Sequence, residues 1–136
     1  MKASGGCLCG AVRYEIDGDP IFAGHCHCTD CQKATGTGHV SVTCLPAAAV
    51  TVSGETRGFA VTGESGSSYA RQFCPTCGSL LFGQSASMPG MMLVTAGTLD
   101  DPSLYQPQMV IYTRSRPAWD RIDSGLPEFA GMPPPG

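Results

Sequence analysis

Apolar and polar residues alternate in several short segments of the chain, which is the pattern of half-buried β-strands. In AVRYEID (11–17), Val12, Tyr14 and Ile16 would share one face of a strand. Further strand segments are HVSVTCL (39–45), AVTVSGE (49–55), RGFAVTGE (57–64), SSYARQFC (67–74), SLLFGQ (79–84), GMMLVTAGTL (90–99) and PQMVIYT (107–113). Because turn residues separate these segments at short intervals, we predict a mainly β fold, a small single domain of antiparallel sheets.

Helix signals are few and short. TDCQKATG (29–36) predicts one short helix, with Thr29 or Asp30 as its N-cap and Gly36 as its stop. The domain is predicted to cover residues 5–129, followed by a Pro/Gly-rich tail over residues 130–136. The single tryptophan, Trp119, is expected to tether its segment to the body of the domain.

Composition narrows the possible functions. The net charge is −3 and the eight Lys and Arg residues form no cluster, so we expect no nucleic-acid partner. The start of the chain does not read as a secretory signal, and the longest apolar run, LPAAAV (45–50), is too short to span a bilayer. We therefore expect a cytoplasmic protein with no membrane contact, and the sequence leaves the oligomeric state open.

The chain holds eight cysteines, which is the strongest chemical signal in the sequence. Seven of them fall into three groups: Cys7 with Cys9; Cys26 with Cys28 and Cys31; Cys74 with Cys77. Without a secretory signal, such groups favour metal ligation over a disulfide framework. Cys44 stands alone and is expected to pack in the core as a small apolar residue.

Two of the cysteine groups predict a closed, structural zinc site. FCPTCG (73–78) has the form of a zinc knuckle, in which Gly78 would take a turn conformation that strains other residues. One knuckle supplies two ligands, and we expect Cys7 and Cys9 to supply the others. On an extended strand these two side chains would project from the same face. A redox C-x-x-C is the alternative, but it expects a βαβ context that the sequence lacks.

The group in HCHCTDC (25–31) predicts a second, open zinc site. Strand alternation would place Cys26 and Cys28 on one face, with His25 and His27 on the other, and Cys31 would return at C-x-x-C spacing. Three protein ligands with a vacant fourth position are the arrangement of catalytic zinc. The alternative is a second closed site, completed by Cys44 or by one of His25, His27 and His39.

Taken together, these motifs resemble those of the glutathione-dependent formaldehyde-activating enzyme family, also described as centromere protein V-like. The matching segments are GGCLCGAVRYE (5–15), CHCTDCQKATG (26–36), RQFCPTCGSLLF (71–82), AGTLDDP (96–102) and PAWDRIDSGLPEF (117–129). The resemblance implies two zinc ions per chain. A structural one would be held by Cys7, Cys9, Cys74 and Cys77, and a more loosely held one by Cys26, Cys28 and Cys31.

The resemblance also implies an activity, the condensation of formaldehyde with glutathione to S-hydroxymethylglutathione, which is classed as a carbon–sulfur lyase reaction. The expected partners are thus a small thiol and an aldehyde. An open zinc ion would lower the pKa of a bound thiol or, alternatively, polarise the carbonyl group. Asp30, His27 and His39 are candidate proton donors by their position in the sequence alone. The competing functions are a zinc-stabilised binding module without turnover and a thiol that acts in redox chemistry or scavenging.

Overall fold

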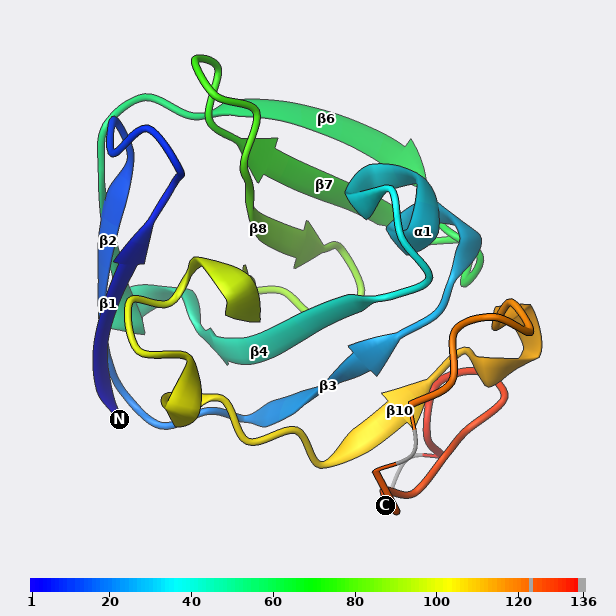
Figure 1. The fold of residues 1–136 in the computed structure, drawn as a ribbon. Coiled ribbons are helices and arrows are strands. Elements are labelled where there is room, and N and C mark those ends of the chain that lie inside the picture. The colour runs from blue at the N-terminus through cyan, green and yellow to red at the C-terminus, as the bar shows by residue number, and fades with distance from the viewer. Residues whose placement is uncertain (123, 135–136) are drawn as a thin grey trace.

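Two β-sheets and one short α-helix make up the fold in a computed structural model, which describes residues 1–122 and 124–134 (Figure 1). Within these residues, one sheet has three strands in the order β1-β2-β5. The other has seven strands in the order β10-β3-β4-β9-β8-β7-β6. All paired strands are antiparallel except β10 and β3, which run parallel. The prediction of a mainly β domain is confirmed, and the larger sheet is mixed.

The strands are β1 (Lys2–Gly6), β2 (Arg13–Asp17), β3 (Phe22–Cys26), β4 (Val40–Pro46), β5 (Val50–Ser53), β6 (Arg57–Thr62), β7 (Ser68–Phe73), β8 (Leu80–Ser85), β9 (Met91–Thr95) and β10 (Met109–Ile111). The helical elements are α1 (Thr29–Thr35) and the 3₁₀ turns η1 (Ala47–Ala49), η2 (Ala96–Thr98), η3 (Pro102–Leu104) and η4 (Thr113–Ser115). Strand β1 pairs with β2, and β3 pairs with both β4 and β10. No strand was predicted at β1, and the strand assumed over HCHC (25–28) overlaps only the last two residues of β3, which ends at Cys26.

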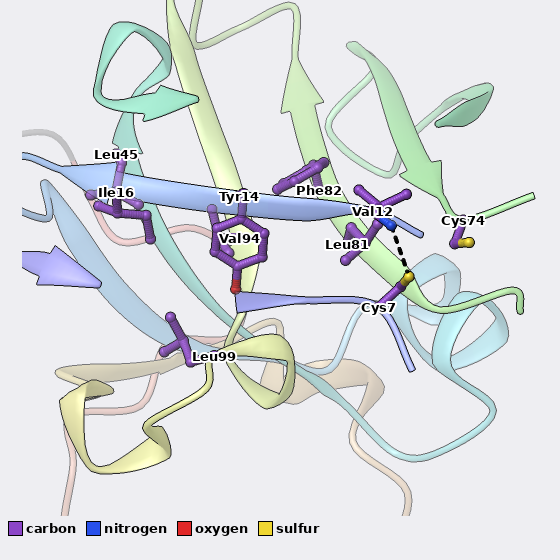
Figure 2. Packing of buried hydrophobic residues seen from close by; sticks show 10 residues of the cluster. All are labelled: Cys7, Val12, Tyr14, Ile16, Leu45, Cys74, Leu81, Phe82, Val94 and Leu99. Atoms are coloured by element: carbon purple, nitrogen blue, oxygen red, sulfur yellow. Dashed lines mark hydrogen bonds between the residues drawn. The ribbon is translucent and has the colours of Figure 1, made fainter. Parts of the chain in front are cut away.

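The main core lies between the two sheets. The alternation predicted for β2 is confirmed, because Tyr14 and Ile16 are buried whereas Arg13 and Glu15 are exposed. Figure 2 shows Tyr14 beside Val94 of β9 and Phe82 of β8, and Ile16 beside Leu45 of β4. The Tyr14 and Phe82 rings meet edge to face, with their centroids 5.4 Å apart.

Strand β4 departs from its predicted alternation. Thr43, which was expected on a polar face, is buried together with its neighbours Cys44 and Leu45. The reason is that both faces of β4 are covered, since Leu45 packs in the core between the sheets and Cys44 packs in a second buried cluster with Leu93. The expectation that Cys44 packs in the core is confirmed, since this side chain is fully buried.

The predicted helix is present, but its cap differs from the one expected. Cys28 is the N-cap of α1, and its sulfur accepts a hydrogen bond from the backbone N–H of Cys31. Gly36 ends the helix in the left-handed conformation, as the sequence indicated. The Thr29 or Asp30 cap was therefore wrong by one or two positions, which places a cysteine at the start of the helix.

Trp119 does not tether its segment, because 71% of its side chain is exposed. The adjacent Asp120 makes the contact with the body of the protein instead. Its carboxylate accepts a hydrogen bond from His39 Nδ1 at 2.8 Å, and only 14% of the Asp120 side chain is exposed. The division into a domain over 5–129 and a tail over 130–136 stays a prediction, and positions 135 and 136 lie outside the described residues.

We expect Tyr14→Phe to lower the free energy of unfolding by about 1 kcal/mol, because the Tyr14 hydroxyl is part-buried and lies 2.7 Å from Thr98 Oγ1. Urea denaturation of zinc-saturated protein measures the change. A double-mutant cycle with Thr98→Val isolates the contact. If the two substitutions add without coupling, this hydrogen bond does not contribute to stability.

Within the described residues, no helix is both long and apolar enough to cross a membrane.

Candidate metal centres

Cys7 and Cys9 lie in the turn that follows β1, not on a strand as the sequence analysis assumed. The backbone N–H of Gly10 donates to the carbonyl oxygen of Cys7 at 3.2 Å and closes this turn. Leu8, between the two cysteines, points outward and is 90% exposed. The two cysteines are therefore brought together by a turn, in place of the strand alternation that was predicted.

Cys74 and Cys77 lie in the turn between β7 and β8, in the knuckle geometry that their motif predicts. Gly78 has a φ of 78°, a conformation that is favourable for glycine and strained for other residues. Its N–H donates to the carbonyl oxygen of Cys74 at 2.8 Å. The knuckle therefore presents both sulfur atoms on one side of a tight turn.

The four sulfur atoms of these two turns gather at one point. All lie within 4.8 Å of one another. The Cys9 sulfur is 3.6 Å from that of Cys7 and 3.7 Å from that of Cys74. A tetrahedral ion with metal–sulfur bonds of about 2.3 Å separates its sulfur ligands by about 3.8 Å. The spacing of this four-cysteine group therefore fits a closed tetrahedral site.

Hydrogen bonds support negative charge on two members of the four-cysteine group, Cys7 and Cys77, whereas the pKa of Cys9 is raised to about 11. The backbone N–H of Val12 donates to the buried Cys7 sulfur at 3.2 Å (Figure 2). Contacts with the hydroxyl and the backbone of Ser79 lower the pKa of Cys77 to about 5. Since metals bind cysteine as thiolate, these donors favour the form that a metal requires.

The second group of cysteines forms where β3 passes into α1. Cys26 is the last residue of β3, Cys28 caps the helix, and Cys31 lies in its first turn. The three sulfur atoms lie within 4.8 Å of one another, and those of Cys28 and Cys31 are 2.8 Å apart. The structure thus brings together the three cysteines that the sequence grouped.

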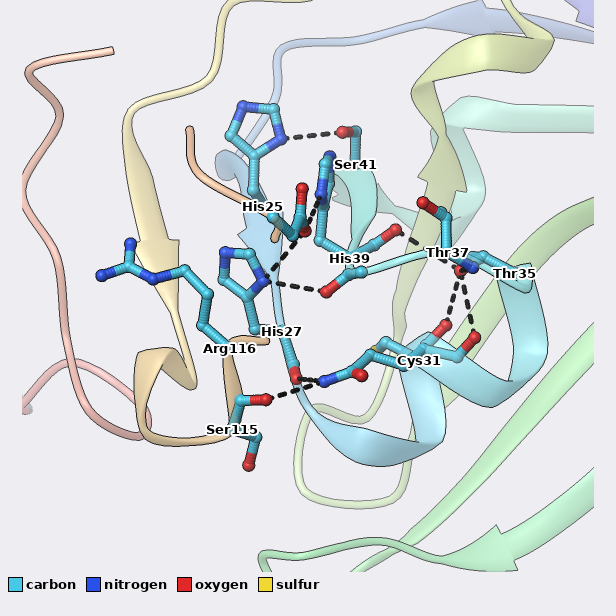
Figure 3. A network of polar contacts seen from close by, with 12 residues as sticks. His25, His27, Cys31, Thr35, Thr37, His39, Ser41, Ser115 and Arg116 are labelled. Atoms are coloured by element: carbon cyan, nitrogen blue, oxygen red, sulfur yellow. Dashed lines mark hydrogen bonds and ion pairs between the residues drawn. The ribbon is translucent and has the colours of Figure 1, made fainter. Parts of the chain in front are cut away.

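The histidines interleaved with these cysteines do not join their group, as predicted. Figure 3 shows the rings of His25 and His27 away from Cys31. His27 is fully buried, with its Nδ1 2.8 Å from the carbonyl oxygen of Gly38. It forms a separate group with His39 and Asp120. His25 Nδ1 contacts the Ser41 hydroxyl at 2.7 Å. Neither a histidine nor Cys44 joins the three-cysteine group in the part of the chain that the structure describes.

The histidine network holds the loop after α1. A Cβ on Gly38 would collide with the Asp120 carboxylate, so only glycine allows this close approach. The side-chain amide of Gln32 donates to the carbonyl oxygens of His27 and Ser115, at 2.8 and 2.9 Å. These contacts fix the helix that carries Cys31 against the backbone of His27 and Ser115.

The three-cysteine group stabilises one thiolate even without a bound metal ion. Hydrogen bonds from the Cys26 and Cys31 thiols lower the pKa of Cys28 to about 3. The same hydrogen bond to Cys28 raises the pKa of Cys26. In addition, Arg71 Nη2 lies 3.6 Å from the Cys31 sulfur. Two of the thiols thus keep their protons, and a cation is required to make all three cysteines anionic.

A cavity of about 140 Å³ opens beside the three-cysteine group. Cys26, Cys28 and Cys31 form part of its wall, together with Asp30, Glu64 and a larger number of apolar side chains. Of the three proton-donor candidates, Asp30 lines the cavity, whereas His27 and His39 do not. One side of the three-cysteine group therefore faces space that a small molecule can enter.

Three residues of this site were not found from the sequence, because each lies far from Cys26, Cys28 and Cys31 along the chain. Glu64 Oε1 accepts hydrogen bonds from the backbone N–H and the hydroxyl of Thr29, at 3.1 and 3.2 Å. Arg71 extends from β7 toward Cys31, with its guanidinium 4.5 Å from the centre of the Tyr69 ring. Tyr112 packs against Cys26 and Cys31 with a left-handed φ of 56°, a strained conformation for a tyrosine.

We expect Glu64→Ala to loosen the start of α1, at a cost of about 1 kcal/mol, because this carboxylate accepts N–H and O–H bonds at a helix N-terminus. Hydrogen–deuterium exchange over residues 28–35 should rise in the variant. Glu55→Ala, at an exposed position, is the matched control and should leave this exchange unchanged. Equal exchange in the two variants would show that Glu64 does not anchor the helix.

A family model and a curated relative both relate the chain to the same enzyme family. The sequence model of the family described as glutathione-dependent formaldehyde-activating enzyme matches residues 2–115. A curated protein of Halomonas elongata, named "Putative glutathione-dependent formaldehyde-activating enzyme", is 27% identical over 149 aligned positions, which cover 98% of this chain and 90% of that protein.

The fold also matches a crystal structure of a Rhodobacter sphaeroides protein, with a TM-score of 0.59 at 19% identity. The match covers 93% of this chain and 98% of that one, and at this identity it supports the fold alone. The family match spans both cysteine groups described above. The chain belongs to the glutathione-dependent formaldehyde-activating enzyme family.

Proposed function

We propose that the chain binds two zinc ions and uses one of them to form or cleave a carbon–sulfur bond between a small thiol and an aldehyde. The four-cysteine group would hold a closed, structural ion. The three-cysteine group would hold an ion with a vacant position. The single observation that carries the proposal is that this second group has three sulfur atoms, and not four, and lines a cavity.

The donor sets support zinc as the metal. Sulfur ligands in a tetrahedral arrangement suit Zn²⁺, and the sulfur spacings of the four-cysteine group match such an ion. In the three-cysteine group, the Cys28 and Cys31 sulfurs at 2.8 Å would have to separate by about 1 Å to reach tetrahedral spacing. The sulfur spacing of the three-cysteine group therefore fits a tetrahedral zinc ion less closely than that of the four-cysteine group. This difference agrees with a second ion that exchanges more easily.

The reaction that fits the family's name joins the sulfur of a thiol to the carbon of formaldehyde. The S–H bond and the π bond of the C=O group break, an S–C bond forms, and the proton ends on the former carbonyl oxygen. A bound zinc ion supplies the lowered thiol pKa that makes a thiolate available at neutral pH. In the reverse direction the adduct returns the thiol and the aldehyde.

The chain's own residues would position the reactants and move the proton. The cavity beside Cys26, Cys28 and Cys31 would hold the organic part of the thiol and exclude water. The half-buried carboxyl group of Asp30 lines the same cavity and is the candidate for the proton relay. Glu64 is held by Thr29 and by Arg114, which lies 3.1 Å away, so we assign it a positioning role.

The test measures adduct formation from a thiol and formaldehyde with zinc-loaded protein, against the uncatalysed rate in the same buffer. We expect an excess rate that disappears when the exchangeable zinc ion is removed and returns when zinc is added. The thiols compared are glutathione, for which the family is named, and a smaller apolar thiol, and an excess rate with either one supports the proposal. If a thiol binds at the metal but the rate stays at background, the alternative function, a zinc-stabilised binding module without turnover, holds instead.

A further inference from the structure

The cavity beside the three-cysteine group is lined mainly by apolar side chains. Three methionines, Met88, Met109 and Met132, come from separate parts of the chain to form its wall. They are joined by the aromatic rings of Phe22, Tyr69 and Tyr112. Methionine sulfur makes favourable contacts with aromatic rings and adapts to the shape of an apolar ligand. This wall favours an aromatic or branched apolar group.

Charge in the cavity has a single sign. Asp30 and Glu64 line it, whereas no Lys, Arg or His does so among residues 1–122 and 124–134. The two nearest arginines are engaged with other groups. Arg71 stacks on Tyr69 and contacts Cys31, and Arg114 pairs with Glu64 at 3.1 Å. A ligand that carries carboxylates would therefore meet Asp30 and the Arg114-paired Glu64, and it would find no cationic side chain on the described cavity wall.

Glutathione carries two carboxylates and one ammonium group at neutral pH. Burying a carboxylate without a charged partner is costly. The volume argues in the same direction, because about 140 Å³ is close to the roughly 150 Å³ of an apolar cavity known to bind benzene. A tripeptide would have to leave most of its atoms outside this cavity.

We propose that the thiol bound at this site is a compact apolar one, with an aromatic or branched hydrocarbon group, and is not glutathione. The inference rests on the proposed function, since it needs a metal at the three-cysteine group to bind the sulfur. The thiol sulfur would lie at the cysteine end of the cavity. Its hydrocarbon group would lie against Met88, Met109 and the aromatic rings.

Calorimetry with zinc-loaded protein tests this by comparing two thiols, phenylmethanethiol and glutathione. We expect phenylmethanethiol to bind at least about tenfold more tightly, because its ring fills the cavity and carries no charge to desolvate. Met88→Lys should lower the affinity for phenylmethanethiol and raise the affinity for glutathione, each by about fivefold or more, because the lysine puts a cation on the cavity wall. Phe59→Lys is the matched control: Phe59 is 68% exposed and lies outside the cavity.

The outcomes separate this inference from the proposed function. Glutathione binding as tightly as phenylmethanethiol, with no response to Met88→Lys, would overturn the inference and leave the proposed function standing. If the protein holds its zinc and binds neither thiol, both fail. Should Met88→Lys not fold, Met132→Lys places the same charge at an exposed position on the cavity wall and gives the same test.

Discussion

Cys74→Ser is expected to abolish the cooperative fold of the domain and to release the zinc ion of the four-cysteine group. Cys74 is fully buried, and its sulfur lies 3.7 Å from that of Cys9. Structural zinc contributes roughly 10–16 kcal/mol to the folding of small zinc domains, whereas the net stability of a typical domain is only about 5–15 kcal/mol. If loss of one ligand releases the ion, the free energy lost is therefore comparable to the whole stability of the fold. Near-ultraviolet circular dichroism and zinc analysis of purified protein measure the two effects.

Cys44→Ser is the matched control, because Cys44 is also fully buried but belongs to neither cysteine group. The added hydroxyl should cost about 1–3 kcal/mol, while both zinc ions and the fold are retained. If Cys74→Ser behaves like Cys44→Ser, with a cooperative transition and unchanged zinc, the four-cysteine group does not hold the fold together.

Cys28→Ser is expected to remove the exchangeable zinc ion and to lower adduct formation by about 100-fold or more, while the fold persists. Cys28 is the N-cap of α1, and serine is a favourable N-cap that accepts the same hydrogen bond from the Cys31 N–H. The substitution therefore takes away a sulfur ligand without disturbing the start of the helix. Zinc analysis, thermal unfolding and the adduct assay measure the three effects on one preparation.

The comparison variant is Thr29→Ser, which changes the neighbouring residue and leaves all three sulfurs in place. It should keep two zinc ions and the full rate. If Cys28→Ser unfolds the domain as Cys74→Ser does, the two groups are both structural and the proposed division of roles is wrong. If its rate equals that of the unsubstituted protein, the reaction does not depend on this site.

Sequence reasoning succeeded where a local pattern determines the structure. The alternation in β2 requires one buried face in any sheet, and the C-x-x-C-G knuckle closes a turn by itself. Hydrophobic periodicity gave no signal for β1 (Lys2–Gly6) or β3, since small residues and glycine leave little contrast between faces. These strands form because β2, β4 and β10 offer backbone partners, which is information that no single segment contains.

The site shows the same limit. Cys7 and Cys9 were placed together correctly but for the wrong physical reason, since a turn and not a strand joins them. Glu64 and Arg71 reach the cysteines only because β6 and β7 lie near α1 in the folded chain (Figure 1). Trp119 shows the limit of residue type as a guide, because this large aromatic side chain was expected to pack against the domain and is instead exposed. Contacts between segments that are distant in the sequence therefore determine the positions of Glu64 and Arg71, which no motif specifies.

X-ray absorption at the zinc edge, recorded before and after mild chelation, tests the central claim most directly. Protein as purified should hold two zinc ions per chain, with an average of more than three sulfur ligands and fewer than four. After chelation one ion should remain, with four sulfur ligands and an intact fold. Finding four sulfur ligands on both ions, or losing both ions together with the fold, would contradict the assignment of one sealed and one open site.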